Sequence, residues 1–372
     1  MAAVYPSGTN TYLPSFDATG NMIVSFSRNV KDFALNKYVT ITPVTKSTGY
    51  YLRLTYEQAA RVSNANLNEF VWHDGNDAAT GEFNKESFTF DSYKTERYAF
   101  PFRLGYKAVD QADWKIIAQH SAIIGQQAMT ARTLQVYNKV NTSGNWDTTT
   151  LSKQFFDTAT NAFDTPANTG GLGIATGTSS TTSGLSGSGL ARGTANNPVI
   201  KKFLNAAAIR MNKKTLGVVG PKDLQWVMSP SVAQVLAVSE ELQDYLKQSP
   251  FALAQVRGDS QSQNGIYGLP DQLYGYNIVI EDAVRIGQKK KDSAAPDYIW
   301  GNTTALLARP GQLVGFEGAP SFSALHLMMY EEMTVEQRDD PDNRRITARV
   351  VEDYGTEVVA PVAGFIIQNS LS

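Results

Sequence analysis

The chain has 372 residues, enough to bury a sizeable core in more than one lobe. Its formal net charge of −2 gives no sign of a nucleic-acid-binding or membrane-binding surface. The absence of cysteine excludes disulfides, iron–sulfur clusters and thiolate zinc sites. The first 27 residues contain no Lys or Arg, and the longest apolar run, 358–367, is too short to span a bilayer. We therefore expect a soluble, cytoplasmic product.

Two segments near the N-terminus are predicted to depend on another surface. Residues 1–48 mix Pro, Gly, Asn and Thr with isolated aromatic rings, which predicts an arm with little regular structure; a floppy terminus is the alternative. Strand patterns at 49–55 and 83–107 flank a polar tip at 64–81 and predict a long hairpin. A hairpin of this length is barely stable alone in water. Its own chain is only one candidate for the surface on which it lies.

A long helix is predicted over residues 110–140. Asp110 followed by Asp113 is typical of an N-cap with acid in the first turn, and the helix would be about 45 Å long. At 100° per residue a broad apolar stripe forms from Trp114, Ile117, Ala118, Ile124, Gly125, Ala128 and Ala131. A narrower stripe on the far side consists of Ile116, Ile123 and Leu134. Two stripes predict that two different surfaces contact this helix.

The second half of the chain mixes helices and strands. Helices are predicted at 151–163, at 199–213 and from the Ser229-Pro230 cap to about 246, with a mobile Gly/Ser/Thr-rich loop at 167–197. Strands are predicted at 217–228 with an internal turn, 276–280, 298–308, 324–335, 345–351 and 358–368. The class is therefore mixed α+β.

The sequence shows no catalytic constellation. His73, His120 and His326 are isolated from one another, and neither a His-Glu-x-x-His nor a Gly-x-Ser-x-Gly motif occurs. We expect no catalytic residues, no cofactor-binding residues and no metal site, and hence no enzyme.

Three local motifs are better explained as surface features than as sites. The glycine run at 170–177 follows no strand and opens no helix, so a linker is favoured over a dinucleotide-binding turn. The acidic stretch 339–343 lacks the Gly and the closing Glu of an EF-hand loop, and a hairpin turn is favoured. The lysine run 289–291 has no neighbouring aromatics, so a solvated loop is favoured over a nucleic-acid patch.

The order of these elements resembles a known family. The segment Val227-Met-Ser-Pro-Ser-Val232 before a helix, and Gly268-Leu-Pro270 before the strand at 273–282, carry the local likeness, together with the closing strands at 345–353 and 358–368. Over nearly the whole chain the arrangement resembles the HK97-type major capsid protein of tailed double-stranded DNA bacteriophages. The resemblance divides the chain into an N-terminal arm (1–48), an E-loop (49–107), a first P-domain part (108–222) containing the spine helix 110–140 and the loop 167–197, an A-domain (223–322) and closing P-domain strands (323–372).

The resemblance implies an HK97-like capsid fold and a structural role. Hexamers and pentamers of the chain would form an icosahedral shell enclosing phage double-stranded DNA, without sequence-specific DNA binding and without a membrane. The protein would reside in the virion after assembly in the host cytoplasm, with scaffolding protein, portal and decoration proteins as partners. Some members cross-link an E-loop lysine; Lys85 and Lys94 lie in the corresponding region, but nothing identifies their partner. An encapsulin-like compartment shell and an enzyme of unknown chemistry remain as alternatives.

Overall fold

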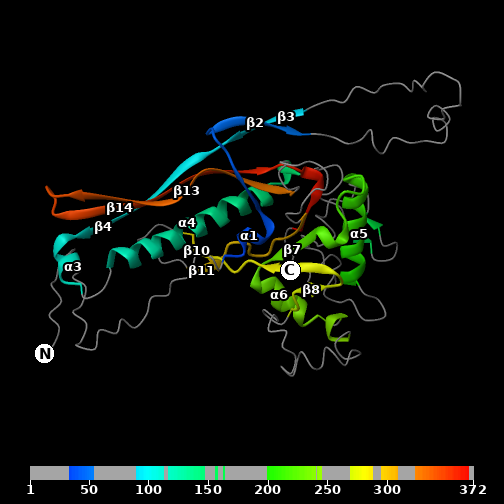
Figure 1. Ribbon diagram of the computed structural model, residues 1–372. Coiled ribbons are helices and arrows are strands. Elements are labelled where there is room, and N and C mark those ends of the chain that lie inside the picture. Colours follow the sequence, from blue (N-terminus) through cyan, green and yellow to red (C-terminus); the bar gives the residue numbers. More distant parts are fainter. Residues whose placement is uncertain are drawn as a thin grey trace, which may run out of the picture.

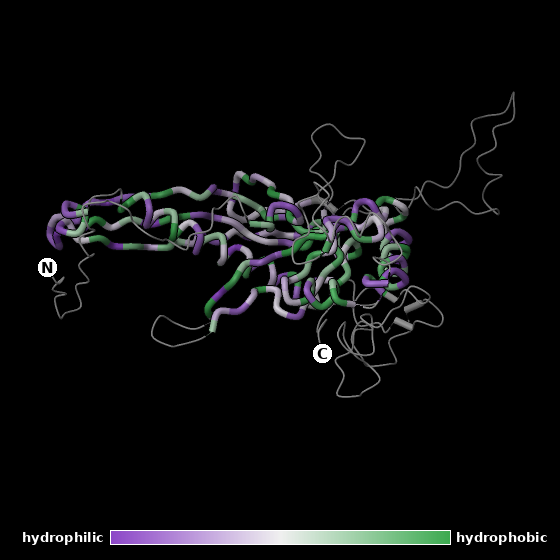
Figure 2. The backbone as a smooth tube through the Cα atoms, turned by 90° about the horizontal axis from the view of Figure 1, so that it is seen from below, coloured by the Kyte–Doolittle hydropathy of each residue, from purple (hydrophilic) through white to green (hydrophobic). Residues whose placement is uncertain are grey.

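The computed structural model describes residues 33–53, 89–112, 116–146, 156–157, 162–163, 199–239, 241–244, 269–287, 295–308 and 323–367. The described chain has an elongated half, in which long strands extend away from the body, and a compact half (Figures 1 and 2). The two halves lie end to end. Their mixture of helices and strands confirms the predicted α+β class.

The elongated half is a four-stranded sheet with one long helix along it. The strand order is β1 (Thr40–Pro43), β13 (Leu325–Asp340), β14 (Arg345–Val358) and β4 (Glu96–Gly105); β1 is parallel to β13 and the other pairs are antiparallel. Helix α4 (Ile116–Asn141) runs along this sheet and contacts β14 and β4 (Figure 1). Antiparallel strands with one covered face alternate between buried and exposed residues, as β4 does toward its end.

The compact half is built on a five-stranded sheet. Its order is β15 (Gly364–Ile367), β12 (Thr304–Ala308), β7 (Leu224–Met228), β9 (Tyr276–Ile280) and β8 (Gln272–Leu273), with β7 and β9 parallel. Every residue of β7 and β12 is buried, as expected of central strands covered on both faces. Helices α5 (Val199–Lys214) and α6 (Pro230–Ala237) lie beside the sheet (Figure 1).

Short elements complete the fold. They are the helices α1 (Leu35–Tyr38) and α3 (Tyr106–Asp110), the 3-10 turns η3 (Ser143–Asn145), η5 (Pro221–Asp223) and η6 (Pro361–Ala363), and the two-stranded pairs β2–β3 (Thr48–Arg53, Thr89–Lys94), β5–β6 (Phe156–Asp157, Ala162–Phe163) and β10–β11 (Val284–Ile286, Pro296–Tyr298).

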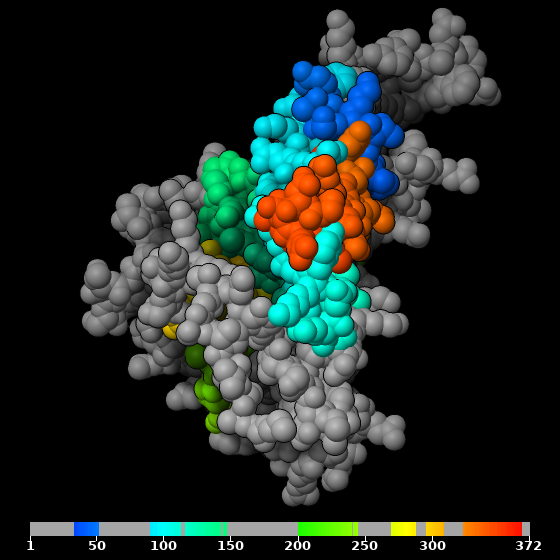
Figure 3. All heavy atoms as spheres, turned by 90° about the vertical axis from the view of Figure 1, so that its left-hand side faces the viewer, coloured from blue at the N-terminus to red at the C-terminus, as the bar shows by residue number. Residues whose placement is uncertain are grey.

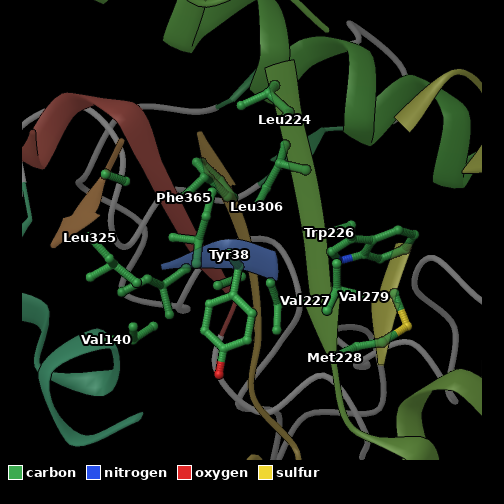
Figure 4. Packing of buried hydrophobic residues seen from close by; sticks show 14 of the residues in the cluster. Tyr38, Val140, Leu224, Trp226, Val227, Met228, Val279, Leu306, Leu325 and Phe365 are labelled. Atoms are coloured by element: carbon green, nitrogen blue, oxygen red, sulfur yellow. The ribbon is translucent and has the colours of Figure 1, made fainter. Parts of the chain in front are cut away.

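One large core joins the two halves. It includes Tyr38 of α1, Val140 of α4, Trp226 of β7 and Phe365 of β15. Figure 4 shows Tyr38, Val140 and Phe365 on one side of β7 and the Trp226 ring on its other side. Tyr38 meets Trp300 edge to face at a centroid separation of 5.8 Å. Because α1 and α4 contribute to the same core as the five-stranded sheet, the halves are packed together rather than tethered.

Helix starts follow from specific caps. Ser229 Oγ accepts a hydrogen bond from the Val232 amide at 3.4 Å, which confirms the predicted cap of α6. Helix α5 is capped from a distance, because the buried Glu241 carboxylate accepts from the amides of Ile200 and Lys201 at 2.7 and 3.1 Å. A carboxylate at a helix N-terminus accepts hydrogen bonds from amides that have no partner within the helix, and its negative charge interacts favourably with the helix dipole.

The predicted start of the long helix is wrong. Asp110 is the last residue of α3, and the described part of the long helix begins at Ile116. The chain enters α3 directly after β4, where the Tyr106 amide donates to the Arg344 carbonyl at 3.0 Å. Asp110 thus belongs to the preceding short helix, and Asp113 and Trp114 lie outside the described residues. The described helix has 26 residues, and its end at Asn141 agrees with the prediction.

The predicted division of the helix into stripes is only partly correct. Gly125 and Ala128 of the broad stripe are buried, whereas Ala118 is exposed. Ile116 of the narrow stripe is buried and Ile123 is 43% exposed. The buried face runs instead through Met129, Arg132, Thr133, Val136 and Val140. The apolar pattern missed this face because it includes a charged residue, Arg132, whose partner lies on the sheet.

Three further expectations need correction. Residues 33–43 are not an irregular arm, because α1 is buried in the core and β1 pairs with β13. Residues 156–157 and 162–163 pair as strands, so the helix predicted at 151–163 is wrong there. The helix from Pro230 ends at Ala237, and 241–244 forms a separate helical turn.

The last described strand, β15, belongs to a different sheet from β14. Residues 364–367 pair with β12 in the five-stranded sheet and not with β14, contrary to their grouping with the closing strands of the other half. Pro361 starts a 3-10 turn after β14, which ends the strand and redirects the chain. The strand expected at 298–308 is likewise divided into β11 and β12.

Candidate interaction surfaces

The polar residues examined for chemistry do not form a common site. The His326 imidazole is buried beside Thr42, whose hydroxyl lies 2.9 Å from Nδ1, and burial lowers the pKa of His326 to about 4. His120 Nδ1 lies 3.1 Å from the Ile116 carbonyl on its own helix, and His73 is outside the described residues. Over the described part of the chain, His, Asp and Glu side chains gather nowhere in a metal-binding group.

The acidic stretch at 339–343 is a hairpin turn. Asp340 accepts hydrogen bonds from Asn343 Nδ2 at 2.9 Å and from Arg345 Nε at 2.8 Å, and these bonds lower the pKa of the Asp340 carboxyl, with the Asn343 bond contributing most. Asp339 accepts from the Tyr106 hydroxyl. The carboxylates are thus used by neighbouring side chains. None of the described helices is long and apolar enough to cross a membrane.

The ribbon β2–β3 meets the long sheet around Thr95 and Gly355, and we call this contact the root of the ribbon. The Thr95 amide donates to the Ser47 carbonyl at 2.8 Å, and Thr95 itself is buried. Directly beneath, Gly355 of β14 faces the Lys94 carbonyl and the Thr95 Cα so closely that any Cβ at position 355 would collide with this backbone. The glycine at position 355 therefore allows the ribbon backbone to pass this close to β14.

One face of this ribbon is aromatic and exposed. The register pairs Tyr50 with Ser92 and Leu52 with Phe90, which places Tyr50 and Phe90 as diagonal neighbours on the same face. Tyr50 is 77% exposed and Phe90 is 67% exposed. On the opposite face Tyr93 covers Gly49. We call Tyr50 and Phe90 the ribbon face. Adjacent exposed aromatic rings are a feature that protein interaction surfaces often share.

The ribbon is oriented toward the compact half of the molecule. Figure 1 shows β2 and β3 above the long sheet, with their open end pointing to the side on which α5 stands. The predicted strands at 49–55 and 83–107 are confirmed in part, because the second is divided into β3 and β4 at Thr95. The tip at 64–81 and Lys85 lie outside the described residues, and Lys94 forms an exposed ion pair with Glu96 at 3.0 Å.

A buried charge pair fixes α4 on the sheet. Arg132 Nη2 donates to Glu352 Oε2, and both side chains are buried, at 7% and 0% exposure. The guanidinium also lies over the Tyr354 ring, 5.3 Å from its centroid. Burial raises the pKa of Glu352, and Arg132 opposes this shift. Burial and the neighbouring Glu352 also raise the pKa of Tyr354.

Further polar contacts line the same seam. Lys139, seven residues after Arg132 on α4, places its Nζ 3.2 Å from Glu357 Oε2. On the sheet, Arg97 lies 3.2 Å from Glu331 and 3.6 Å from Asp353. The long helix is thus held to the strands by charges as well as by apolar contacts.

The distal half of β13 forms an open edge of the long sheet. Strand β1 pairs with β13 only from His326 to Met329, and no other described strand covers the rest of that side. Tyr330 and Val335 on this part are 42% and 53% exposed. Irregular pairing around Glu331 and the many acidic residues make it a poor template for uncontrolled strand addition. Figure 3 looks onto this end, where the tip of β13–β14 projects beside β4.

Sequence reasoning missed the root and the charge pair. The only available signal for the root was a glycine, Gly355, inside a strand pattern, which can mark a close backbone approach. Arg132 and Glu352 are separated by 220 residues, and their contact depends on the placement of α4 on the sheet. Nothing local in the sequence indicates it.

The comparisons with known proteins give a clear answer for the fold. No family model matches the sequence, and no curated protein is recognisably similar to it. A chain in the capsid structure of the cyanophage P-SCSP1u is similar at a TM-score of 0.53 and 10% identity, over 100% of both chains. A phage-related protein of Bordetella bronchiseptica RB50 is similar at a TM-score of 0.51 and 13% identity, over 91% of both chains. The chain thus shares its fold with a phage capsid structure, and the capsid fold expected from the sequence is confirmed.

Proposed function

We propose that the chain is a phage major capsid protein. Copies of it assemble through hexamers and pentamers into an icosahedral shell that encloses double-stranded DNA, and the chain acts without catalysis. The observation that carries this proposal is the likeness to a cyanophage capsid chain over the full length of both proteins. The same likeness favours a phage shell over an encapsulin-like compartment or an enzyme.

The domain roles follow the observed halves of the molecule. We assign the long sheet and α4 to the P-domain, with α4 as its spine, and the five-stranded sheet to the A-domain. The ribbon β2–β3 forms the root of the E-loop, which spans 49–107 up to the end of β4. The pairing of β15 with β12 supports moving residues 364–367 into the A-domain. The N-terminal arm is then restricted to the residues before 33, because α1 belongs to the core.

The ribbon face supplies the assembly contact. Tyr50 and Phe90 lie on a two-stranded ribbon, which is not stable alone in water, and they gain from contact with a surface outside their own subunit. In a closed ring each subunit uses two different patches, one donated and one received. We assign the ribbon face as the donated patch, which covers part of the next subunit.

Further partners follow from the same role. The shell requires a scaffolding protein and a portal, and decoration proteins are accessory. Assembly takes place in the host cytoplasm and the protein ends in the virion. The net charge of −2 supports a shell that encloses DNA by confinement without sequence-specific contacts.

Assembly of the purified chain tests this function. Sedimentation velocity and negative-stain electron microscopy across ionic strengths, with and without an added crowding agent, should show capsomer-sized rings or closed shells. A chain that stays monomeric under all these conditions, and also when expressed to high level in cells, would contradict the proposal. Well-formed particles of one size support it directly.

A further inference from the structure

Two arginines and a threonine form a row across the distal part of the long sheet. The strand register places Thr347 of β14 between Arg103 of β4 and Arg338 of β13, each of which is its direct partner on one side. Residues that lie directly opposite each other in antiparallel strands point to the same face of the sheet. We call these three residues the arginine row. The Cα atoms of the two arginines are two strand spacings apart, roughly 10 Å, so their long side chains can approach each other above Thr347.

The arginine row lies on the face of the sheet that α4 leaves uncovered. The adjacent residues Phe102 and Ala348 are buried in a cluster with Ile116 of α4. Because successive residues of a strand point to opposite faces, the row points away from this helix. Both arginines of the row are exposed and its threonine is half-buried. Figure 1 shows α4 below the distal ends of these strands and no described helix or strand above them.

The nearest carboxylates on this face already have partners. Arg345 and Arg349, two residues before and after Thr347, lie with their Nε atoms 2.8 Å from Asp340 and 2.5 Å from Glu336. Over the described part of the chain, the two arginines of the row form no ion pair, and none of its three side chains forms a hydrogen bond. The row can therefore meet an anion without giving up an existing contact.

The side chains of the row suit a carboxylate. Each guanidinium has five N–H donors in a planar fork that matches the two oxygens of a carboxylate, and the threonine hydroxyl can donate one more hydrogen bond. Charge-assisted hydrogen bonds of this kind are stronger than hydrogen bonds between neutral groups. Two cations on either side of a hydroxyl thus form a set of donors that lacks only its acceptor.

The charge pattern around the row favours a protein segment over nucleic acid. The same sheet face carries four carboxylates, which belong to Glu331, Glu336, Asp340 and Asp353. Double-stranded DNA has one negative charge per about 1.7 Å of its axis, so a duplex laid across this face would place phosphates against those carboxylates. A protein segment can instead present a few separated acidic side chains to the row alone.

We propose that the arginine row binds carboxylates of an acidic segment of a partner protein. The row is complete within one subunit, so this inference goes beyond the proposed function and does not depend on shell assembly. The exposed position of the row allows a partner to bind after the chain has folded.

Binding of an acidic peptide to the full-length protein tests this site. The probe is a dye-labelled hexaglutamate peptide, followed by fluorescence anisotropy at low salt, with hexaglutamine as the uncharged comparison. The variant Arg103→Gln with Arg338→Gln should bind hexaglutamate at least about tenfold more weakly than the wild type. Arg285→Gln, at an exposed arginine on β10 of another sheet, is the matched control and should bind like the wild type.

A second variant separates charge from geometry. Arg103→Lys with Arg338→Lys keeps both charges and removes the planar forks, so it should recover only part of the lost affinity. Melting curves should show that all these variants fold like the wild type, because the replaced side chains are exposed.

Three results would overturn the proposal. The first is equal affinity of the wild type and the glutamine variant for hexaglutamate, whether or not that variant still assembles, and the second is no binding by the wild type. The third is tighter binding of a short DNA duplex than of hexaglutamate at the same salt, lost in the same variant, because the row would then be a phosphate site. A protein that binds the peptide as expected but forms no shell would contradict the proposed function alone.

Discussion

Arg132 on α4 and Glu352 on β14 form an ion pair with both side chains buried. Glu352 Oε1 and Arg132 Nε have no hydrogen-bond partner among the described residues, so the pair is only partly satisfied. Burying two charges costs free energy that their attraction recovers only with good geometry. The pair therefore fixes where α4 lies on the sheet more than it stabilises the fold.

A double-mutant cycle tests this view of the pair. Arg132→Met alone leaves Glu352 as an uncompensated buried carboxylate and should destabilise the subunit by about 3–5 kcal/mol. Adding Glu352→Leu should recover most of that loss, because two apolar side chains replace the charges. Chemical denaturation of unassembled protein measures both values. If the double variant lost as much free energy of unfolding as the two single variants together, this view of the pair would be contradicted.

The root of the ribbon depends on a single glycine. Gly355→Ala should push the Lys94–Thr95 backbone away from β14 and destabilise the subunit by about 1–3 kcal/mol. Gly105→Ala is the matched control, because nothing lies within 4 Å of a Cβ at that position and its φ of −69° suits alanine. Thermal unfolding compares the two variants. Equal stability of both would show that the ribbon can shift without cost.

The ribbon face should matter for assembly and not for folding. Tyr50→Ser with Phe90→Ser removes two rings that are 77% and 67% exposed, so the melting temperature of the monomer should change little. Assembly should fall by about tenfold or more, as expected when central aromatic contacts are removed from an interface. Val238→Ser, at a residue 61% exposed on another surface, serves as the control. Unchanged particle yield from the double variant would remove the ribbon face from the interface.

His326 should make the subunit sensitive to acid. Its folded pKa of about 4 lies below the unfolded value of about 6.5, so below pH 6.5 the unfolded state binds a proton that the folded state excludes. Stability due to the neutral imidazole is complete above pH 6.5 and decreases as the pH falls toward 4, by up to about 3 kcal/mol. Denaturation curves at pH 7 and pH 4.5 for the wild type and His326→Gln measure the difference. The variant should lose less stability between the two pH values.

The sequence predicted correctly those elements that depend mainly on residues adjacent in the chain. The strand at Tyr276–Ile280 and the cap at Ser229 were predicted correctly, because a β-branched run after a turn and a Ser-Pro step are sufficient signals. The order of elements also predicted the capsid fold. The start of the long helix was missed because α3 begins directly after β4 and uses Asp110 as its last residue.

Contacts between distant segments could not be predicted in this way. The exposure of Tyr50 and Phe90 on one face depends on the register of β2 with β3, and the sheet change of 364–367 depends on a 3-10 turn at Pro361. The Arg132–Glu352 pair contradicts the apolar stripe that sequence periodicity favours. In each case tertiary packing overrides the local pattern.

The central claim is that this chain forms a shell in which the ribbon of one subunit covers the next. Electron cryomicroscopy of the assembled particle measures this most directly. We expect an icosahedral reconstruction in which Tyr50 and Phe90 are buried against a neighbouring copy. A particle whose subunits leave both rings in solvent, or a protein that forms no particle at all, would contradict the account.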